Sequence, residues 1–151
     1  MNQQILSYKK RLDNLFKLSE KISDIEVQSH WARYLTVLVY GYIEISVRYT
    51  LMDYVEIHAD ELVNNYASNQ INLFSSPKTN NVINILCLYS KSWGENLEQR
   101  INDEIKASVD SIVNNRHKIA HGENTGISLV TIKNYYKNAK KFIRVLTNIC
   151  N

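Results

Sequence analysis

The spacing of its apolar residues constrains the fold of this chain more than any other feature. In every long segment they recur three or four positions apart, as on one face of a helix, and the period is interrupted only at residues 23–26, 68–78, 91–94 and 122–127. One Pro and four Gly are too few turn-forming residues for a fold with many strands. The pattern predicts an all-α fold, an antiparallel bundle of four main helices with one or two additional short helices and no sheet.

Chain length, termini and cysteines indicate the kind of protein. A chain of 151 residues fits one helical domain over residues 1–151 with a single core. The N-terminus has no signal-peptide core and no apolar run approaches membrane-spanning length, so we expect a cytoplasmic protein with no membrane partner. Cys87 and Cys150 lie in apolar helical patterns without zinc-ligand spacing, which predicts two buried free thiols and no metal site.

The first two helices differ in their apolar pattern. The first is expected from Asn2 to about Ile22, with a clear apolar side. The second is expected to begin near Val27, and its residues 31–45 are apolar nearly all round, which is typical of a central helix packed on several sides. Gly41 within it costs about 1 kcal/mol relative to Ala. We therefore expect Gly41 to allow the close approach of another helix.

Capping and turn-forming residues set the later boundaries. Thr79 is a plausible N-cap for a short helix, and Ser128 for the last one. Residues 91–94 are expected to end that short helix and form a break between helices. One continuous helix is then predicted from Glu95 to Gly122.

The end of that continuous helix holds the residues best suited to chemistry. Arg116 falls on or beside the apolar stripe, and its fixed charge needs anions or carbonyls around it if it is buried. His121 occupies the last turn, where the helix dipole favours its protonated form, and Gly122 is the residue type that commonly ends a helix. A fixed cation and a titratable ring can handle a phosphodiester. An Arg in a core ion pair and a His as a C-terminal cap explain the same residues structurally.

Glu44 lies in the middle of the most apolar helix and needs a partner. Arg116, on the other core helix, is one candidate. Arg48, one turn along the same helix, is the other. The sequence leaves these two alternatives open.

The last predicted helix has a basic face opposite its apolar positions. Its cations recur at helical spacing with nothing acidic between them: Lys133, Lys137, Lys140, Lys141 and Arg144. Such a stripe can follow a phosphate backbone, although runs of this kind are commonly only a solvated face. The formal net charge of +3 permits nucleic-acid binding without arguing for it.

The run from Arg116 to Gly122 resembles the signature of the HEPN superfamily, which is Arg, a polar residue, three further residues and His at a helix end. The chain is most similar to the RiboL-PSP-HEPN type, whose motif often reads Arg-Asn-x-x-Ala-His-Gly. The expected position on the penultimate helix of a small helical chain also matches. The resemblance implies a metal-independent endoribonuclease with no cofactor, acting on RNA as a homodimer whose two motifs face each other.

The resemblance also implies a role for each residue. Arg116 would hold the phosphate oxygens and His121 would move protons while the ribose 2′-hydroxyl attacks, leaving 2′,3′-cyclic phosphate ends. Glu44 would orient Arg116, with His117 and Asn115 in support, and a second His would come from the partner subunit. The cations expected to contact RNA are Lys133, Lys137, Lys140 and Arg144.

Two classes of function follow from the resemblance. The first is a ribonuclease toxin or anti-phage defence effector, with a composite active site at the homodimer interface and a possible cognate antitoxin of a nucleotidyltransferase or other kind. The second is a catalytically inactive HEPN-like module that binds RNA or another protein. The sequence names neither the RNA target nor an operon partner.

Overall fold

The computed structural model describes residues 2–150, and over them the chain forms seven helices and no strand. The helices are α1 (Gln3–Ser19), α2 (Ile25–His58), α3 (Glu61–Asn72), α4 (Thr79–Tyr89), α5 (Lys91–Arg100), α6 (Asp103–Ala120) and α7 (Leu129–Ile149). The all-α prediction is confirmed. Four helices are long, and three short ones lie between α2 and α6, where one or two were expected.

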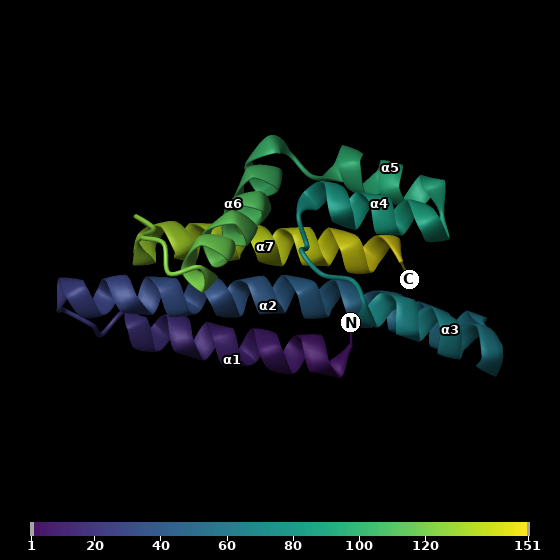
Figure 1. The fold of residues 1–151 in the computed structure, drawn as a ribbon, viewed down its shortest axis with the longest axis horizontal. Helices are drawn as coiled ribbons and strands as arrows, with labels where there is room; N and C mark the ends of the chain where they lie inside the picture. Colours follow the sequence, from purple (N-terminus) through teal and green to yellow (C-terminus); the bar gives the residue numbers. More distant parts are fainter. Residues whose placement is uncertain (1, 151) are drawn as a thin grey trace.

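The long helix α2 is the centre of the molecule. It packs against α1, α3, α6 and α7, which confirms the prediction from its all-round apolar sequence. Figure 1 shows α1 along one side of α2, α7 along the other, and α6 crossing α7 at an angle. Consecutive long helices run in opposite directions, whereas α2 and α7 run in the same direction. The ends of α1 and α6 and the beginnings of α2 and α7 therefore gather at one end of the molecule (Figure 1).

The core is built from the faces that α2 and its neighbours turn toward one another. Leu35 and Ile43 of α2, Ile112 of α6 and Phe142 of α7 are fully buried. Each such side chain contributes about 1.5–3 kcal/mol to folding by leaving water. The close approach predicted at Gly41 is made by a side chain of α1, because a Cβ built there would lie 2.9 Å from the Tyr8 hydroxyl oxygen.

Two predicted breaks were misplaced. The helix predicted from Glu95 to Gly122 is divided, because the Asn102 side chain caps α6 by accepting a hydrogen bond from the Ile105 N–H at 2.9 Å. Residues 91–94 are helical and form the beginning of α5, where a break between helices was predicted. Gly94 serves close packing there, since a Cβ on it would lie 2.2 Å from the Cys87 sulfur.

Other predicted boundaries are corrected by burial and capping. Residues 68–70, expected as loop, lie inside α3, which continues to bring the buried Ile71 onto the core. Ser128 caps α7 as predicted, its hydroxyl accepting from the Thr131 N–H at 3.1 Å. Thr79 is instead the first residue of α4, after Lys78 at the N-cap position.

The two cysteines differ in exposure. Cys150 is buried, and burial raises the pKa of its thiol to about 12. Cys87 is exposed on α4, so the prediction of a second buried thiol was wrong. The apolar residues of α4 surround the helix, and only some of them can face the core; Leu88, next to Cys87, is 85% exposed. In the described part of the chain no helix is both long and apolar enough to cross a membrane.

Candidate functional site

The C-terminus of α6 ends as the sequence predicts. His121 is the C-cap residue, and Gly122 has a φ of 71°, in the left-handed region. The Gly122 N–H donates to the Ile119 carbonyl at 3.1 Å, and the Glu123 N–H donates to the Lys118 carbonyl at 2.9 Å. These two bonds form a Schellman motif, which satisfies the last carbonyls and fixes the direction in which the chain leaves the helix.

Arg116 is held by an aromatic ring. It is half-buried, and its guanidinium carbon lies 4.8 Å from the centroid of the Tyr40 ring on α2. Among residues 2–150 no carboxylate forms an ion pair with it. A cation over a buried aromatic face is stabilised by the ring quadrupole, by about 0.5–2 kcal/mol. This contact orients Arg116 without neutralising its charge.

Glu44 pairs with the nearer of its two candidate partners. Its carboxylate oxygen lies 2.9 Å from a terminal nitrogen of Arg48. Arg48 also donates from Nε to the Phe74 carbonyl at 3.0 Å, so the pair fixes the segment that joins α3 to α4. The alternative pair of Glu44 with Arg116 is not formed, and the role predicted for Glu44 in orienting Arg116 was wrong. Tyr40, one turn earlier on α2, occupies that place.

His117 and His121 are brought together. They stand one turn apart on α6, and their ring centroids are 4.4 Å apart at an interplanar angle of 65°. Both side chains are exposed. The side chain of Arg116 points in another direction. Five residues at about 100° each make about 500°, so Arg116 and His121 lie about 140° apart around the helix axis. One chain therefore presents a histidine pair on one side of α6 and Arg116 on the side that faces α2.

Asn115 is engaged with its own helix. Its side-chain amide donates to the Ser111 carbonyl at 2.8 Å, and the residue is half-buried. Within the described residues the Asn115 side chain forms no hydrogen bond with His117 or His121, so no contact supports the role predicted for it. Its neighbour Asn114 is exposed and faces a hollow beside the helix.

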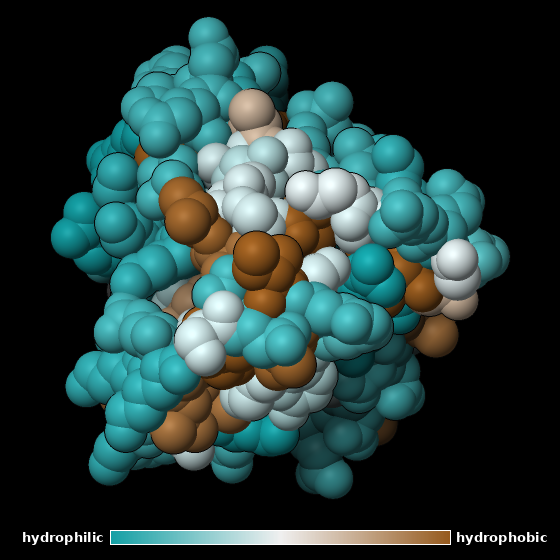
Figure 2. Space-filling model, turned by 90° about the vertical axis from the view of Figure 1, so that its left-hand side faces the viewer, coloured by the Kyte–Doolittle hydropathy of each residue, from teal (hydrophilic) through white to brown (hydrophobic). Residues whose placement is uncertain are grey.

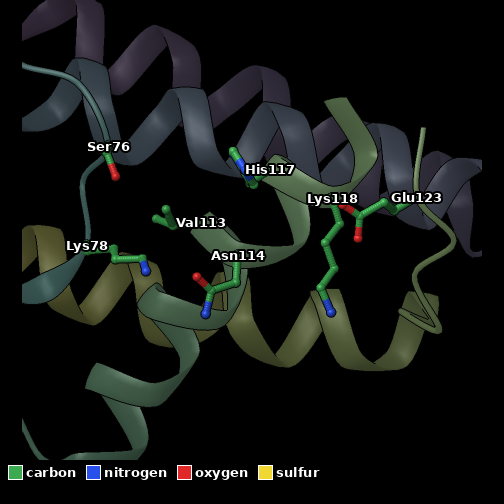
Figure 3. A pocket seen from close by; sticks show the side chains of 7 residues that line it. All are labelled: Ser76, Lys78, Val113, Asn114, His117, Lys118 and Glu123. Atoms are coloured by element: carbon green, nitrogen blue, oxygen red, sulfur yellow. The ribbon is translucent and has the colours of Figure 1, made fainter. Parts of the chain in front are cut away.

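This hollow, which we call the α6 hollow, has a volume of about 520 Å³. One wall comes from α6 and carries Val113, Asn114, His117 and Lys118 (Figure 3). The opposite wall is the segment between α3 and α4, and carries Ser76 and Lys78. Because His117 lines the α6 hollow and touches His121, the histidine pair stands at its edge.

The basic stripe of α7 lies against acidic residues on α1 and directly after it. Lys133 pairs with Glu20, and the Lys140 Nζ lies 3.3 Å from an Asp13 carboxylate oxygen. Nothing acidic lies between these cations in the sequence, but carboxylates from a distant part of the chain meet two of them. Lys137 and Arg144 stay exposed, and neither forms an ion pair within residues 2–150.

Tyr40, Ser76 and Lys78 had not been selected from the sequence. Tyr40 had the appearance of one more apolar residue of α2, because only the packing of α6 shows what its ring contacts. A weak signal for the other two was present in Ser75-Ser76-Pro77, which marks a turn. In the part of the chain that the structure describes, no three His, Cys, Asp or Glu side chains are arranged to hold a metal ion.

Comparison with known proteins identifies the family. The model of the RiboL-PSP-HEPN family matches residues 3–151. Neither the curated proteins nor the solved structures gave a match. HEPN domains are associated with nuclease or RNA-binding functions. Because the match covers nearly the whole sequence and includes the run from Arg116 to Gly122, the chain belongs to the RiboL-PSP-HEPN family.

Proposed function

We propose that this chain is a metal-independent endoribonuclease and acts in the cytoplasm as a toxin or anti-phage defence effector. The observation that carries the proposal is the contact of His117 with His121, 4.4 Å between ring centroids, at the exposed end of α6 in a HEPN-family chain. Arg116 supplies a permanent cation from the same helix end. Titratable rings and a fixed cation at one surface suit the cleavage of RNA by its own 2′-hydroxyl.

The reaction is an internal transfer at phosphorus. The ribose 2′-oxygen forms a bond to the phosphorus as its proton passes to a neutral imidazole. The bond from phosphorus to the 5′-oxygen breaks, and that oxygen takes a proton from a protonated imidazole. The products are a 2′,3′-cyclic phosphate and a free 5′-hydroxyl. The guanidinium of Arg116 stabilises the charge on the non-bridging oxygens, for which its planar fork is suited.

The directions of the side chains support a composite site in a homodimer. Since Arg116 and His121 diverge by about 140° around α6, one phosphate meets both groups most readily where two chains face each other. Arg116 would then act with the partner subunit's His121. His117, in contact with His121, supports the proton transfers from within the same chain.

The part of α2 that precedes Tyr40 exposes apolar side chains. Tyr34 is 45% and Val37 is 39% exposed, and both stand within two turns of Tyr40 on α2. Figure 2 shows apolar surface gathered at the end of the molecule where α2 begins and α6 ends. An apolar patch rimmed by polar residues is typical of an interaction surface. We assign it to the homodimer, and propose an antitoxin of a nucleotidyltransferase or other kind as a further partner.

One observation favours the alternative, a catalytically inactive module that binds RNA or protein. The guanidinium of Arg116 is stacked on Tyr40, and in this alternative the contact serves only packing. The same experiment separates the two functions.

That experiment is cleavage of RNA by the purified chain, with analysis of the product ends. We expect 2′,3′-cyclic phosphate ends, a loss of about 10²–10⁴-fold in rate for His121→Ala, and loss of most activity for Arg116→Lys. The matched control is His58→Ala, an exposed histidine at the other end of α2. Expression of the parent should also arrest growth, and His121→Ala should abolish the arrest. Cleavage that leaves 3′-hydroxyl ends, or His121→Ala cutting as fast as His58→Ala, would refute the proposal.

A further inference from the structure

The α6 hollow has the size and position of a ligand site that the cleavage chemistry does not itself require. At about 520 Å³ it lies within the range of small-molecule pockets, about 300–1,000 Å³. His117 forms part of its wall and leads directly to His121. We propose that the α6 hollow binds one nucleotide of the RNA, next to the phosphate that is cleaved. The proposal rests on the proposed function for its location beside the reacting phosphate.

The wall opposite α6 is held in one conformation. Ser76 has a φ of 58°, in the left-handed region that non-glycine residues rarely adopt. Its N–H donates to the Tyr40 hydroxyl at 3.2 Å. Its carbonyl accepts from the Asn81 side-chain amide and from the Lys78 N–H, each at 2.8 Å. Backbone strain that is maintained by several bonds is characteristic of preformed sites, because a rigid wall loses little entropy on binding.

Lys78 provides the charge for a phosphate. It is exposed at the wall of the α6 hollow, and in the described residues no carboxylate pairs with it. Figure 3 shows its side chain directed toward Asn114 across the opening, whereas Lys118 stands one turn farther along α6, in the part of the hollow where Glu123 adds a carboxylate. We therefore assign the phosphate contact to Lys78. A compact ammonium group binds phosphate as a point charge.

Asn114 provides the groups that read a base. Its amide offers two donors and an acceptor, and it forms no hydrogen bond with any other described residue. Val113, 5% exposed, adds an apolar surface behind it. A site with an unpaired amide, an apolar surface and a cation matches a base with its phosphate. A bare inorganic anion would leave the amide and the apolar surface unused.

The test measures RNA binding separately from cleavage. It uses fluorescein-labelled r(A), r(C) and r(U) homopolymers about ten nucleotides long, long enough for a single-strand site. Anisotropy is recorded at several salt concentrations. All variants carry His121→Ala so that the RNA stays intact. Lys78→Ala and Asn114→Ala are compared with Lys91→Ala on α5 and Asn14→Ala on α1, which remove the same groups from exposed positions elsewhere.

We expect Lys78→Ala to weaken binding of all three RNAs about five- to tenfold and to lower the salt slope by about one. Asn114→Ala should change the preference among the RNAs, because base contacts carry specificity whereas phosphate contacts do not. The two control variants should bind like the parent.

Equal affinity of the Lys78 and Asn114 variants and their controls overturns the assignment, as does a chain that binds none of the RNAs. If the parent binds RNA through Lys78 and Asn114 but does not cut it, the α6 hollow stands as a nucleotide site and the proposed catalysis fails. The two failures are therefore distinguishable.

Discussion

The guanidinium of Arg116 lies over the ring of Tyr40, with 4.8 Å from its central carbon to the ring centroid. The hydroxyl of the same tyrosine accepts a hydrogen bond from the Ser76 N–H at 3.2 Å. Tyr40 is only 8% exposed, so its side chain is packed on nearly all sides. One buried side chain thus connects the proposed catalytic cation with a wall of the α6 hollow.

The two contacts of Tyr40 can be separated by substitution. Tyr40→Phe keeps the ring under Arg116 and loses the bond to Ser76, so we expect a higher KM and a nearly unchanged kcat. Tyr40→Leu loses the ring as well, and kcat should fall by about 2- to 30-fold, the equivalent of about 0.5–2 kcal/mol. Steady-state cleavage rates measure both effects, and unfolding curves show whether each variant is folded. Equal kcat values for the two variants would mean that the ring does not position Arg116.

The oligomeric state is the next prediction. Val37 is 39% exposed on α2, about one turn before Tyr40, and an isologous interface would place it against a second copy. We expect light scattering to show a dimer for the parent and a monomer for Val37→Asp. Leu88→Asp is the matched control, since Leu88 is 85% exposed on α4 and should leave the dimer intact. A parent that is monomeric throughout the micromolar range contradicts the homodimer.

The sequence predicted the helices well where burial repeats along one element. In the last helix the spacing gives six apolar positions. Four of them are fully buried, Ile132, Ala139, Phe142 and Leu146, and two are only partly buried, Tyr135 and Ile149. The same spacing of apolar residues continues from α5 into α6, so the break between these two helices was not predicted. Ile101 is 4% exposed and continues the apolar period across the break, so only the capping bond of Asn102 marks the end of one helix and the start of the next.

The surroundings of the charged residues could not be predicted in this way. Lys133 pairs with Glu20, 113 positions away, because the fold brings the end of α1 close to the beginning of α7. Arg116 meets Tyr40 for the same kind of reason, through the packing of α6 on α2. The spacing of apolar residues along a helix indicates which face of that helix is buried. It does not indicate which other helix will pack against that face.

Metal independence is tested with chelator. The proposed reaction uses imidazole and guanidinium groups only, so cleavage should be unchanged in EDTA. His117 and His121 stand at a spacing that pairs of metal ligands also use on helices. Activity that EDTA abolishes and zinc restores would therefore assign these rings to a metal ion and contradict the proposed roles.

The end of α6 makes a prediction about stability. Gly122 has a φ of 71°, and an added Cβ there meets nothing within 4 Å, so only backbone strain opposes a side chain. Gly122→Ala should lower the free energy of unfolding by about 1–2 kcal/mol. Gly126→Ala is the matched control, because that site is equally open and its φ is not positive. Urea unfolding measures both, and an equal effect of the two substitutions would show that the left-handed turn is not the cause.

Asp13 makes the stability of the fold depend on pH. It lies on α1 and accepts hydrogen bonds from Lys9 of the same helix at 3.0 Å, and from Tyr136 at 2.9 Å and Lys140 at 3.3 Å, both on α7. Partial burial alone would raise the pKa of this carboxyl, but the three donors hold it below its ordinary value of 3.8. In the unfolded chain the carboxyl takes up its proton at higher pH than in the folded one. Its contribution to stability is therefore complete above the unfolded value and is lost as the pH falls through the folded value.

Asp13→Asn removes this titration and should flatten the fall in stability below about pH 4. At neutral pH the same substitution should lower the free energy of unfolding by about 0.2–1 kcal/mol, because Lys9 and Lys140 lose a partly exposed partner. Urea unfolding at a series of pH values measures both effects. Glu98→Gln on the exposed side of α5 is the control, and it should leave the pH profile as it is in the parent. If Asp13→Asn and Glu98→Gln give the same profile, the contacts that join α1 to α7 through Asp13 do not stabilise the fold.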